Sequence, residues 1–169
     1  MINVAGIIHE DGVNGPGLRC TIFVQGCDHK CKGCHSTHTW KFGAGVDMSV
    51  EELVAECNKN PLESGITLSG GDPVYQYEPL TAVLERVDPN KHKMLYTGFT
   101  KEELELFIYT KERFSRFIEQ FDLIVTDPFI LEQRDLNLLY RGSKNQRLCV
   151  PTWVGESLFI ADVTETYDK

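Results

Sequence analysis

The chain has 169 residues, of which 41% are hydrophobic and 25% charged, a composition ordinary for a water-soluble globular domain. Its formal net charge of −8 disfavours sequence-independent binding to nucleic acid, because a negative surface repels phosphates. No stretch is apolar enough to span a bilayer, and residues 1–6 lack the basic and apolar regions of a secretory signal. We therefore expect one cytoplasmic domain over residues 1–169, with a frayed tail at 161–169.

Short segments rich in β-branched and aromatic residues recur along the chain and predict strands. The first is expected at residues 4–8, before a glycine- and proline-rich turn at 14–17. A buried strand at 19–25 then runs directly into a loop with three cysteines. The later strands are predicted at residues 65–69, 93–97, 123–125 and 147–150.

Helices are predicted where capping signals precede them. Ser49 and Thr100 each begin a capping box, because a glutamate stands three positions after each of them. The helix after Ser49 should reach about residue 59, and a helix or helix pair after Thr100 should reach about residue 120. A further helix is expected at 79–87, with proline in its first turn.

Alternation of strands and helices predicts an α/β fold with a mostly parallel sheet and outer helices. About five strand–helix units fit, too few for a complete eight-fold barrel. We therefore expect an open, partial β/α barrel, with a doubly wound sheet as the alternative. Ligands of such folds bind at the carboxyl ends of the strands. The glycine-bearing loops at Gly26, Gly70–Gly71 and Gly98 all follow predicted strands and should meet at one rim.

The six cysteines are not expected to form disulfides in a reducing cytoplasm. Three of them, Cys27, Cys31 and Cys34, have the spacing C-x3-C-x2-C, and such clustering indicates a metal site. The other three are scattered and are expected to be small, buried, apolar side chains: Cys20, Cys57 and Cys149.

Three thiolates on one loop can bind three corners of a cubane iron–sulfur cluster, which usually takes four cysteines. The fourth iron would keep an open site, and an open site on a metal favours catalysis over electron storage. The competing interpretation is structural zinc, with His29 or His35 as the fourth ligand, although zinc sites more often use a second cysteine pair. A loop that binds no metal is disfavoured, because three exposed thiols are reactive.

The order of these motifs resembles the radical S-adenosylmethionine superfamily, in which a C-x3-C-x2-C loop is followed by a strand ending in a glycine pair, here Gly70-Gly71-Asp72-Pro73. Within it, the chain is similar to the glycyl-radical activating enzymes and, more narrowly, to the anaerobic ribonucleoside-triphosphate reductase activating proteins. The segments that carry this resemblance are 14–20, 23–27, 34–40, 69–73, 96–99 and 140–146.

The resemblance implies that Cys27, Cys31 and Cys34 hold a [4Fe–4S] cluster that binds and reductively cleaves S-adenosylmethionine. The resulting 5′-deoxyadenosyl radical would remove a hydrogen from a glycine in the glycyl-radical loop of the reductase large subunit. Reduced flavodoxin or a similar donor would supply the electron. No catalytic side chain is expected, because the cofactors carry the chemistry and hydrogen abstraction by a radical needs no protein base.

The resemblance also implies a set of cofactor-binding residues: Gly33, Cys34, His35, Gly70, Gly71, Asp72 and Gly98. Gly70 and Gly71 would let the methionine ammonium group approach the backbone closely, because no side chain intrudes. Asp72 would either accept a hydrogen bond from that ammonium group or cap the next segment. The backbone around Cys34 would contact the adenine.

Three other functions stay open at this point. The chain could activate a different glycyl-radical enzyme, or act on a small molecule, as a deazaguanine-forming cyclase does. The non-enzymatic alternative is a zinc-binding module. An incomplete barrel leaves a wide lateral opening, which suits a protein loop better than a small substrate that must be sealed from water.

Overall fold

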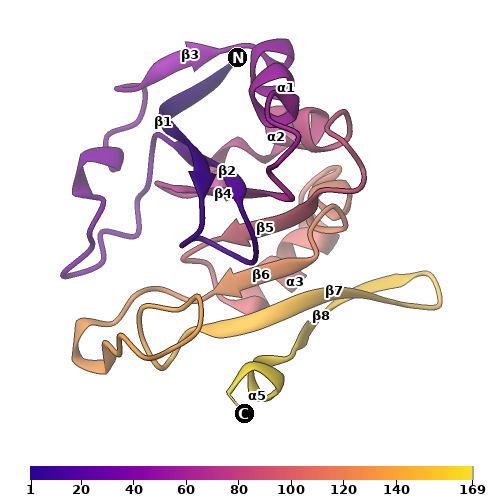
Figure 1. The fold of residues 1–169 in the computed structure, drawn as a ribbon. Helices are drawn as coiled ribbons and strands as arrows, with labels where there is room; N and C mark the ends of the chain where they lie inside the picture. Colours follow the sequence, from indigo (N-terminus) through magenta and orange to yellow (C-terminus); the bar gives the residue numbers. More distant parts are fainter. Residues whose placement is uncertain (169) are drawn as a thin grey trace.

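The structure is a computed structural model that describes residues 1–168, and its strands form a single sheet (Figure 1). The strands are β1 (Ile2–Asp11), β2 (Arg19–Val24), β3 (Val46–Met48), β4 (Gly65–Gly70), β5 (His92–Tyr96), β6 (Leu123–Thr126), β7 (Arg147–Val154) and β8 (Ser157–Asp162). The α-helices are α1 (Val50–Asn58), α2 (Tyr77–Leu84), α3 (Lys101–Thr110), α4 (Phe114–Ile118) and α5 (Thr164–Tyr167). Short 3-10 turns are η1 (Thr37–Thr39), η2 (Pro73–Gln76) and η3 (Leu131–Gln133).

The sheet has the order β3-β1-β2-β4-β5-β6-β7-β8 and is mixed. Its centre is parallel, because β2, β4, β5 and β6 follow one another through helical crossovers. All pairings outside this centre are antiparallel, so the expectation of a mostly parallel sheet is wrong. Connection length explains two of these pairings: β1 joins β2, and β7 joins β8, through short connections, which only antiparallel strands can use.

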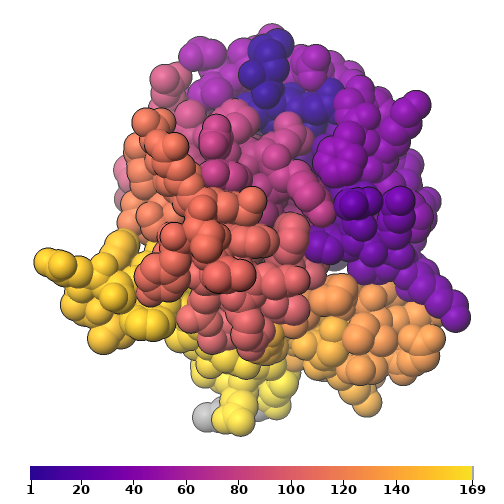
Figure 2. All heavy atoms as spheres, turned by 180° about the vertical axis from the view of Figure 1, so that it is seen from behind, coloured from indigo at the N-terminus to yellow at the C-terminus, as the bar shows by residue number. Residues whose placement is uncertain are grey.

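The helices α1 to α4 cover one face of the sheet. In β2, Cys20, Ile22 and Val24 point into the main hydrophobic core beneath them, while Arg19 and Thr21 alternate to the other face. Neighbouring helices contact one another in the series α1–α2–α4–α3. Figure 2 shows this side, where the coral atoms of α3 and α4 lie over the centre of the molecule. None of the helices within residues 1–168 is long and apolar enough to cross a membrane.

The capping predictions are confirmed. Ser49 Oγ accepts a hydrogen bond from the Glu52 backbone at 3.0 Å, and the Glu52 carboxylate accepts one from the Ser49 backbone at 2.7 Å. Thr100 and Glu103 form the same box, with distances of 3.1 and 2.8 Å. The predicted helix pair is α3 and α4, separated by Arg113 in a left-handed conformation with a φ of 61°.

The described part of the predicted tail, residues 161–168, contacts the rest of the chain; Lys169 lies outside the described residues. Residues 164–167 form α5, and the hydroxyl of Thr164 accepts a hydrogen bond from the Leu148 backbone at 2.9 Å. The Asp168 carboxylate also pairs with the buried Arg141. These contacts join segments far apart in the chain, so the polar composition of the tail did not reveal them.

Arg19 supports the face of the sheet opposite the helices. Its side chain is fully buried, and its guanidinium donates to the Thr67 hydroxyl at 2.7 Å and to the Pro16 and Ile66 carbonyls at 2.7 and 2.8 Å. Burial lowers the pKa of Arg19. The side chain also crosses the place where a Cβ on Gly65 would stand, at 2.1 Å from its Nη1.

We expect Arg19→Leu to lower the free energy of unfolding by about 3 kcal/mol or more, because buried carbonyls lose their charged donor. Urea unfolding measures this directly. The matched control is Arg86→Leu, whose exposed guanidinium pairs with Glu51 at 2.9 Å and should contribute about 0.5 kcal/mol or less. Equal effects of the two substitutions would contradict a structural role for Arg19.

Candidate functional site

The cysteine loop begins where β2 ends. Its start is fixed by backbone hydrogen bonds from Gly26 to the Thr39 carbonyl at 2.7 Å and from Cys27 to the Trp40 carbonyl at 3.1 Å. In Figure 1 this purple loop and the orange loop after β6 lie at the edge to which the arrowheads of β5 and β6 point. The cysteines of the loop therefore lie at the carboxyl ends of the parallel strands, as expected from the sequence.

Cys27, Cys31 and Cys34 are half-buried and share one cavity of about 240 Å³ with the ends of the central strands. The residues that line this cavity are Cys27, His29, Cys31, Cys34, His35, Ser36, Thr39, Trp40, Ser69, Gly70, Gly71, Tyr96, Thr97, Gly98, Asp127, Phe129, Gly142 and Gln146. The three glycine-bearing loops predicted to meet at one rim do meet: Gly71 lies so close to Gly26 that a Cβ on it would stand 2.3 Å from the Gly26 carbonyl oxygen.

Most of the predicted cofactor-binding residues line the cavity, namely Cys34, His35, Gly70, Gly71 and Gly98. Two lie behind its wall. Gly33 has a φ of +80°, and the Leu131 side chain occupies the place where its Cβ would be, at 2.9 Å. Asp72 is buried and faces the loops from below.

Sequence reasoning missed several lining residues, including Tyr96, Asp127 and Phe129. Tyr96 ends β5, and Asp127 directly follows β6. Their position at the carboxyl ends of predicted strands was the signal that could have identified them. Asp127 has a φ of +78°, and Arg147 holds its carboxylate at 2.8 and 3.0 Å.

The Asp72 carboxylate joins three loops. It is 1% exposed and accepts hydrogen bonds from His29 Nε2 at 2.7 Å, the Thr97 hydroxyl at 2.8 Å and the Gly98 backbone at 2.9 Å. It also caps η2 by accepting from the Val74 backbone at 3.1 Å, the second of the two roles expected for it. Its contacts therefore hold the cysteine loop against the ends of β4 and β5.

His29 donates the shortest of the hydrogen bonds that the Asp72 carboxylate accepts. The hydrogen bond to Asp72 raises the pKa of His29, which favours the imidazolium form. Its ring also packs edge-on against Phe99, with centroids 4.6 Å apart. His29 thus holds the cysteine loop in place, and its Nε2 is engaged by a carboxylate.

Within residues 1–168, the only three metal-ligating side chains whose donor atoms all lie within 4.8 Å of one another are His9, Cys20 and Glu63. The three sulfurs of the cysteine loop therefore do not all lie within 4.8 Å of one another.

Burial raises the pKa of Cys27 to about 11 and also raises that of Cys31. Thiolate ligands at these positions consequently need a positive charge beside them, which cluster iron provides. The other three cysteines are fully buried in the hydrophobic core, as predicted: Cys20, Cys57 and Cys149. The cavity thus offers three cysteine ligands, and a fourth iron would be open to a small ligand.

We expect Gly71→Ala to lower the free energy of unfolding by about 1–3 kcal/mol, because its Cβ would overlap backbone atoms at the start of the cysteine loop. Urea unfolding tests this. Gly12→Ala is the matched control, since a Cβ there meets nothing within 4 Å. If both variants unfolded at the wild-type midpoint, the close approach of the two loops would be wrong.

A larger cavity of about 340 Å³ lies on the outer side of α2 and α4. Its lining is dominated by charged side chains that pair with each other, such as Arg116 and Glu85 at 2.6 Å, and it contains no cysteine or histidine. The side chains that line the two cavities therefore favour the smaller one, beside the cysteine loop, as the functional site.

The family model and the relatives that match this chain agree with one another. Residues 13–149 match the family described as a 4Fe-4S single cluster domain. The chain is 36% identical over 145 residues to the anaerobic ribonucleoside-triphosphate reductase-activating protein of Haemophilus influenzae, an alignment that covers 80% of this chain and 90% of the relative. The protein with the same description from Vibrio cholerae is 38% identical over 146 residues, with the same coverage of both chains.

More distant similarities were also found. The anaerobic ribonucleoside-triphosphate reductase-activating protein of Enterobacteria phage T4 is 33% identical over 148 residues, covering 82% of this chain and 87% of the relative. Among solved structures, QueE from Escherichia coli matches with a TM-score of 0.43 and 20% identity, over 59% of this chain and 53% of that one.

Proposed function

Because the chain belongs to the family of anaerobic ribonucleoside-triphosphate reductase-activating proteins, we propose that it activates such a reductase by forming a glycyl radical on it. The protein is a radical S-adenosylmethionine enzyme, and its cofactors are a [4Fe–4S] cluster and S-adenosylmethionine. The observation that carries the proposal is the single cavity in which three thiols face the glycine loops at the ends of β4 and β5.

We propose Cys27, Cys31 and Cys34 as the cluster ligands. When bound, the reduced cluster would supply one electron to S-adenosylmethionine, which would release methionine and give the 5′-deoxyadenosyl radical that abstracts hydrogen from a glycine of the reductase. The chain itself binds, orients and encloses these groups. The half-buried position of all three thiols supports this role, because the ligands are withdrawn from water yet open to the cavity.

Gly70, Gly71 and Gly98 are proposed to form the part of the wall that a cofactor can approach at the level of the backbone. Gly70 has a φ of +100°, a conformation that favours glycine, so the strand can turn there without a side chain entering the cavity. His35 lines the same cavity and is proposed to lie beside the cofactor.

Asp72 and Gly33 are proposed to act on the cofactor through the loops that they position. Asp72 lies beneath the wall, where it fixes the Gly98 backbone and the cysteine loop. The positive φ of Gly33 turns the loop just before Cys34, and the missing side chain admits Leu131.

We propose that the parallel strands β2, β4, β5 and β6, with helices on one face, form an open β/α barrel to which the antiparallel strands are added at both edges. Its open side would admit the glycyl-radical loop of the reductase large subunit. We further propose that residues 1–169 act as one cytoplasmic domain, reduced by flavodoxin or a similar donor. The net charge of −8 supports protein partners over nucleic acid.

The test is anaerobic reconstitution with iron and sulfide, followed by reduction in the presence of S-adenosylmethionine and an anaerobic ribonucleoside-triphosphate reductase. We expect 5′-deoxyadenosine and methionine to form, and a glycyl radical to appear on the reductase by electron paramagnetic resonance. Cofactor cleavage without a reductase radical, but with one on another glycyl-radical enzyme, would replace the proposed partner. A colourless protein with zinc at the three cysteines and no cleavage would contradict the whole proposal.

A further inference from the structure

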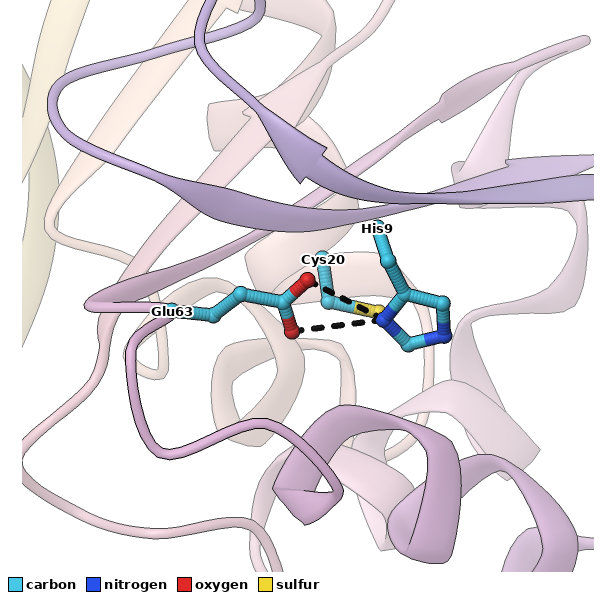
Figure 3. Close-up of side chains that lie close together, drawn as sticks. All are labelled: His9, Cys20 and Glu63. Carbon is cyan, nitrogen blue, oxygen red and sulfur yellow. Dashed lines mark hydrogen bonds and ion pairs between the residues drawn. The ribbon is translucent and has the colours of Figure 1, made fainter.

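A second group of metal-ligating side chains lies at the opposite end of β2 from the cysteine loop. His9 of β1, Cys20 of β2 and Glu63, just before β4, place a nitrogen, a sulfur and a carboxylate oxygen within 4.8 Å of one another. Figure 3 shows the three side chains converging, with the sulfur beside the ring nitrogen that faces the carboxylate.

The spacing of these donors is already close to that of a coordination shell. His9 Nδ1 lies 3.0 and 3.4 Å from the two carboxylate oxygens of Glu63. Nitrogen and oxygen ligands at about 2.0–2.1 Å from a tetrahedral zinc are about 3.3 Å apart. A metal ion could therefore replace the proton between Nδ1 and the carboxylate with little movement of the backbone.

The Glu63 carboxylate is 1% exposed. It accepts a hydrogen bond from the Glu10 backbone at 2.7 Å, and within residues 1–168 its ion-pair partner is His9 alone. Glu56 pairs with the other ring nitrogen of His9 at 2.8 Å and with Lys59 at 3.9 Å. Lys91 points its ammonium group at backbone carbonyls near the end of α1. A divalent cation at Nδ1 would therefore give the buried Glu63 carboxylate a direct cationic partner in place of the imidazole proton.

The surroundings of His9 are those of a metal-binding histidine. Glu56 accepts from His9 Nε2, and such a carboxylate fixes the tautomer that leaves Nδ1 free for a metal. A cavity of about 310 Å³, lined in part by Glu63 and Asp88, lies beside the group.

We propose that His9, Cys20 and Glu63 bind one divalent zinc ion, which joins β1, β2 and the segment before β4. The mixed nitrogen, sulfur and oxygen donors suit zinc, a borderline-soft ion. The site lies at the amino ends of β2 and β4, whereas the cysteine loop lies beyond their carboxyl ends. The proposed zinc site is therefore separate from the cysteine loop and does not depend on the proposed activation of a reductase.

The first test measures iron and zinc together by mass spectrometry in the reconstituted protein, after incubation with one equivalent of zinc and desalting. We expect one zinc per chain in addition to the cluster iron. His9→Gln and Glu63→Gln should weaken zinc binding at least 100-fold in competition with a chromophoric chelator and keep their iron, which shows that they are folded. His38→Gln is the matched control, because this exposed histidine lies outside the group, and it should keep its zinc.

The second test removes the competing thiols by replacing Cys27, Cys31 and Cys34 with alanine and adds cobalt(II). We expect a thiolate-to-cobalt charge-transfer band that disappears when Cys20→Ala is added. The proposal is overturned if wild type holds no more zinc than His9→Gln, or if the triple variant loses the zinc. These outcomes do not depend on whether the protein activates a reductase.

Discussion

Replacing any one of Cys27, Cys31 and Cys34 by alanine should abolish cluster binding and lower S-adenosylmethionine cleavage by more than about 100-fold. Loss of a partner that merely orients a metal ligand already costs about 10–100-fold, so loss of a ligand should cost more. The cavity offers these three thiols, and the other cysteines are fully buried in the hydrophobic core. A variant with two thiolates thus has no replacement cysteine within reach.

Iron content and 5′-deoxyadenosine formation after anaerobic reconstitution measure this effect. Cys149→Ala is the matched control, because this cysteine is buried in β7 and its sulfur contacts the Thr126 hydroxyl at 3.8 Å. The control should keep its iron and lose about 1 kcal/mol of stability. Full cleavage activity in any of the three alanine variants would exclude that cysteine as a ligand.

Asp72→Asn should cost about 3–5 kcal/mol of folding free energy, because it removes one partner of a buried ion pair. The Asp72 carboxylate accepts hydrogen bonds from His29, Thr97 and Gly98. An asparagine side chain at this position has only one oxygen that can accept a hydrogen bond. The amide nitrogen of the asparagine would face one of these three donors and could not accept its hydrogen bond. We therefore expect the cysteine loop to detach from the ends of β4 and β5, with lower iron content after reconstitution.

The control for charge alone is Asp28→Asn in the same loop. Its exposed carboxylate pairs with Lys30 at 3.6 Å, so the change should cost about 0.5 kcal/mol or less. His29→Phe separates packing from hydrogen bonding, since a phenyl ring keeps the contact with Phe99 but cannot donate to Asp72. We expect His29→Phe to retain iron and lose about tenfold or more in cofactor cleavage. Wild-type activity in His29→Phe would refute the positioning role of the histidine.

Features encoded in neighbouring residues could be predicted from the sequence. The spacing of Cys27, Cys31 and Cys34 predicted a metal loop. The capping boxes at Ser49 and Thr100 predicted the starts of two helices, and both helix starts are confirmed. These signals are local, because a cap or a ligand loop is completed within a few residues of the chain. The parallel order of the central strands also followed from the alternation of strands and helices.

Only the tertiary structure decided the pairings and contacts that join distant segments. His29 meets Asp72 across 43 positions of sequence, and His9 meets Glu63 across 54. The antiparallel pairings at both edges of the sheet likewise could not be predicted, because the residue pattern of a strand does not show which strand it pairs with. The sequence by itself thus determined the spacing of the three cysteines in their loop and the type of most elements, because these depend on adjacent residues. Sheet register and loop packing, which only the folded chain sets, decided three other features. These are the hydrogen bonds of Asp72 that hold the cysteine loop, the strand ends that line the cavity, and the group of His9, Cys20 and Glu63.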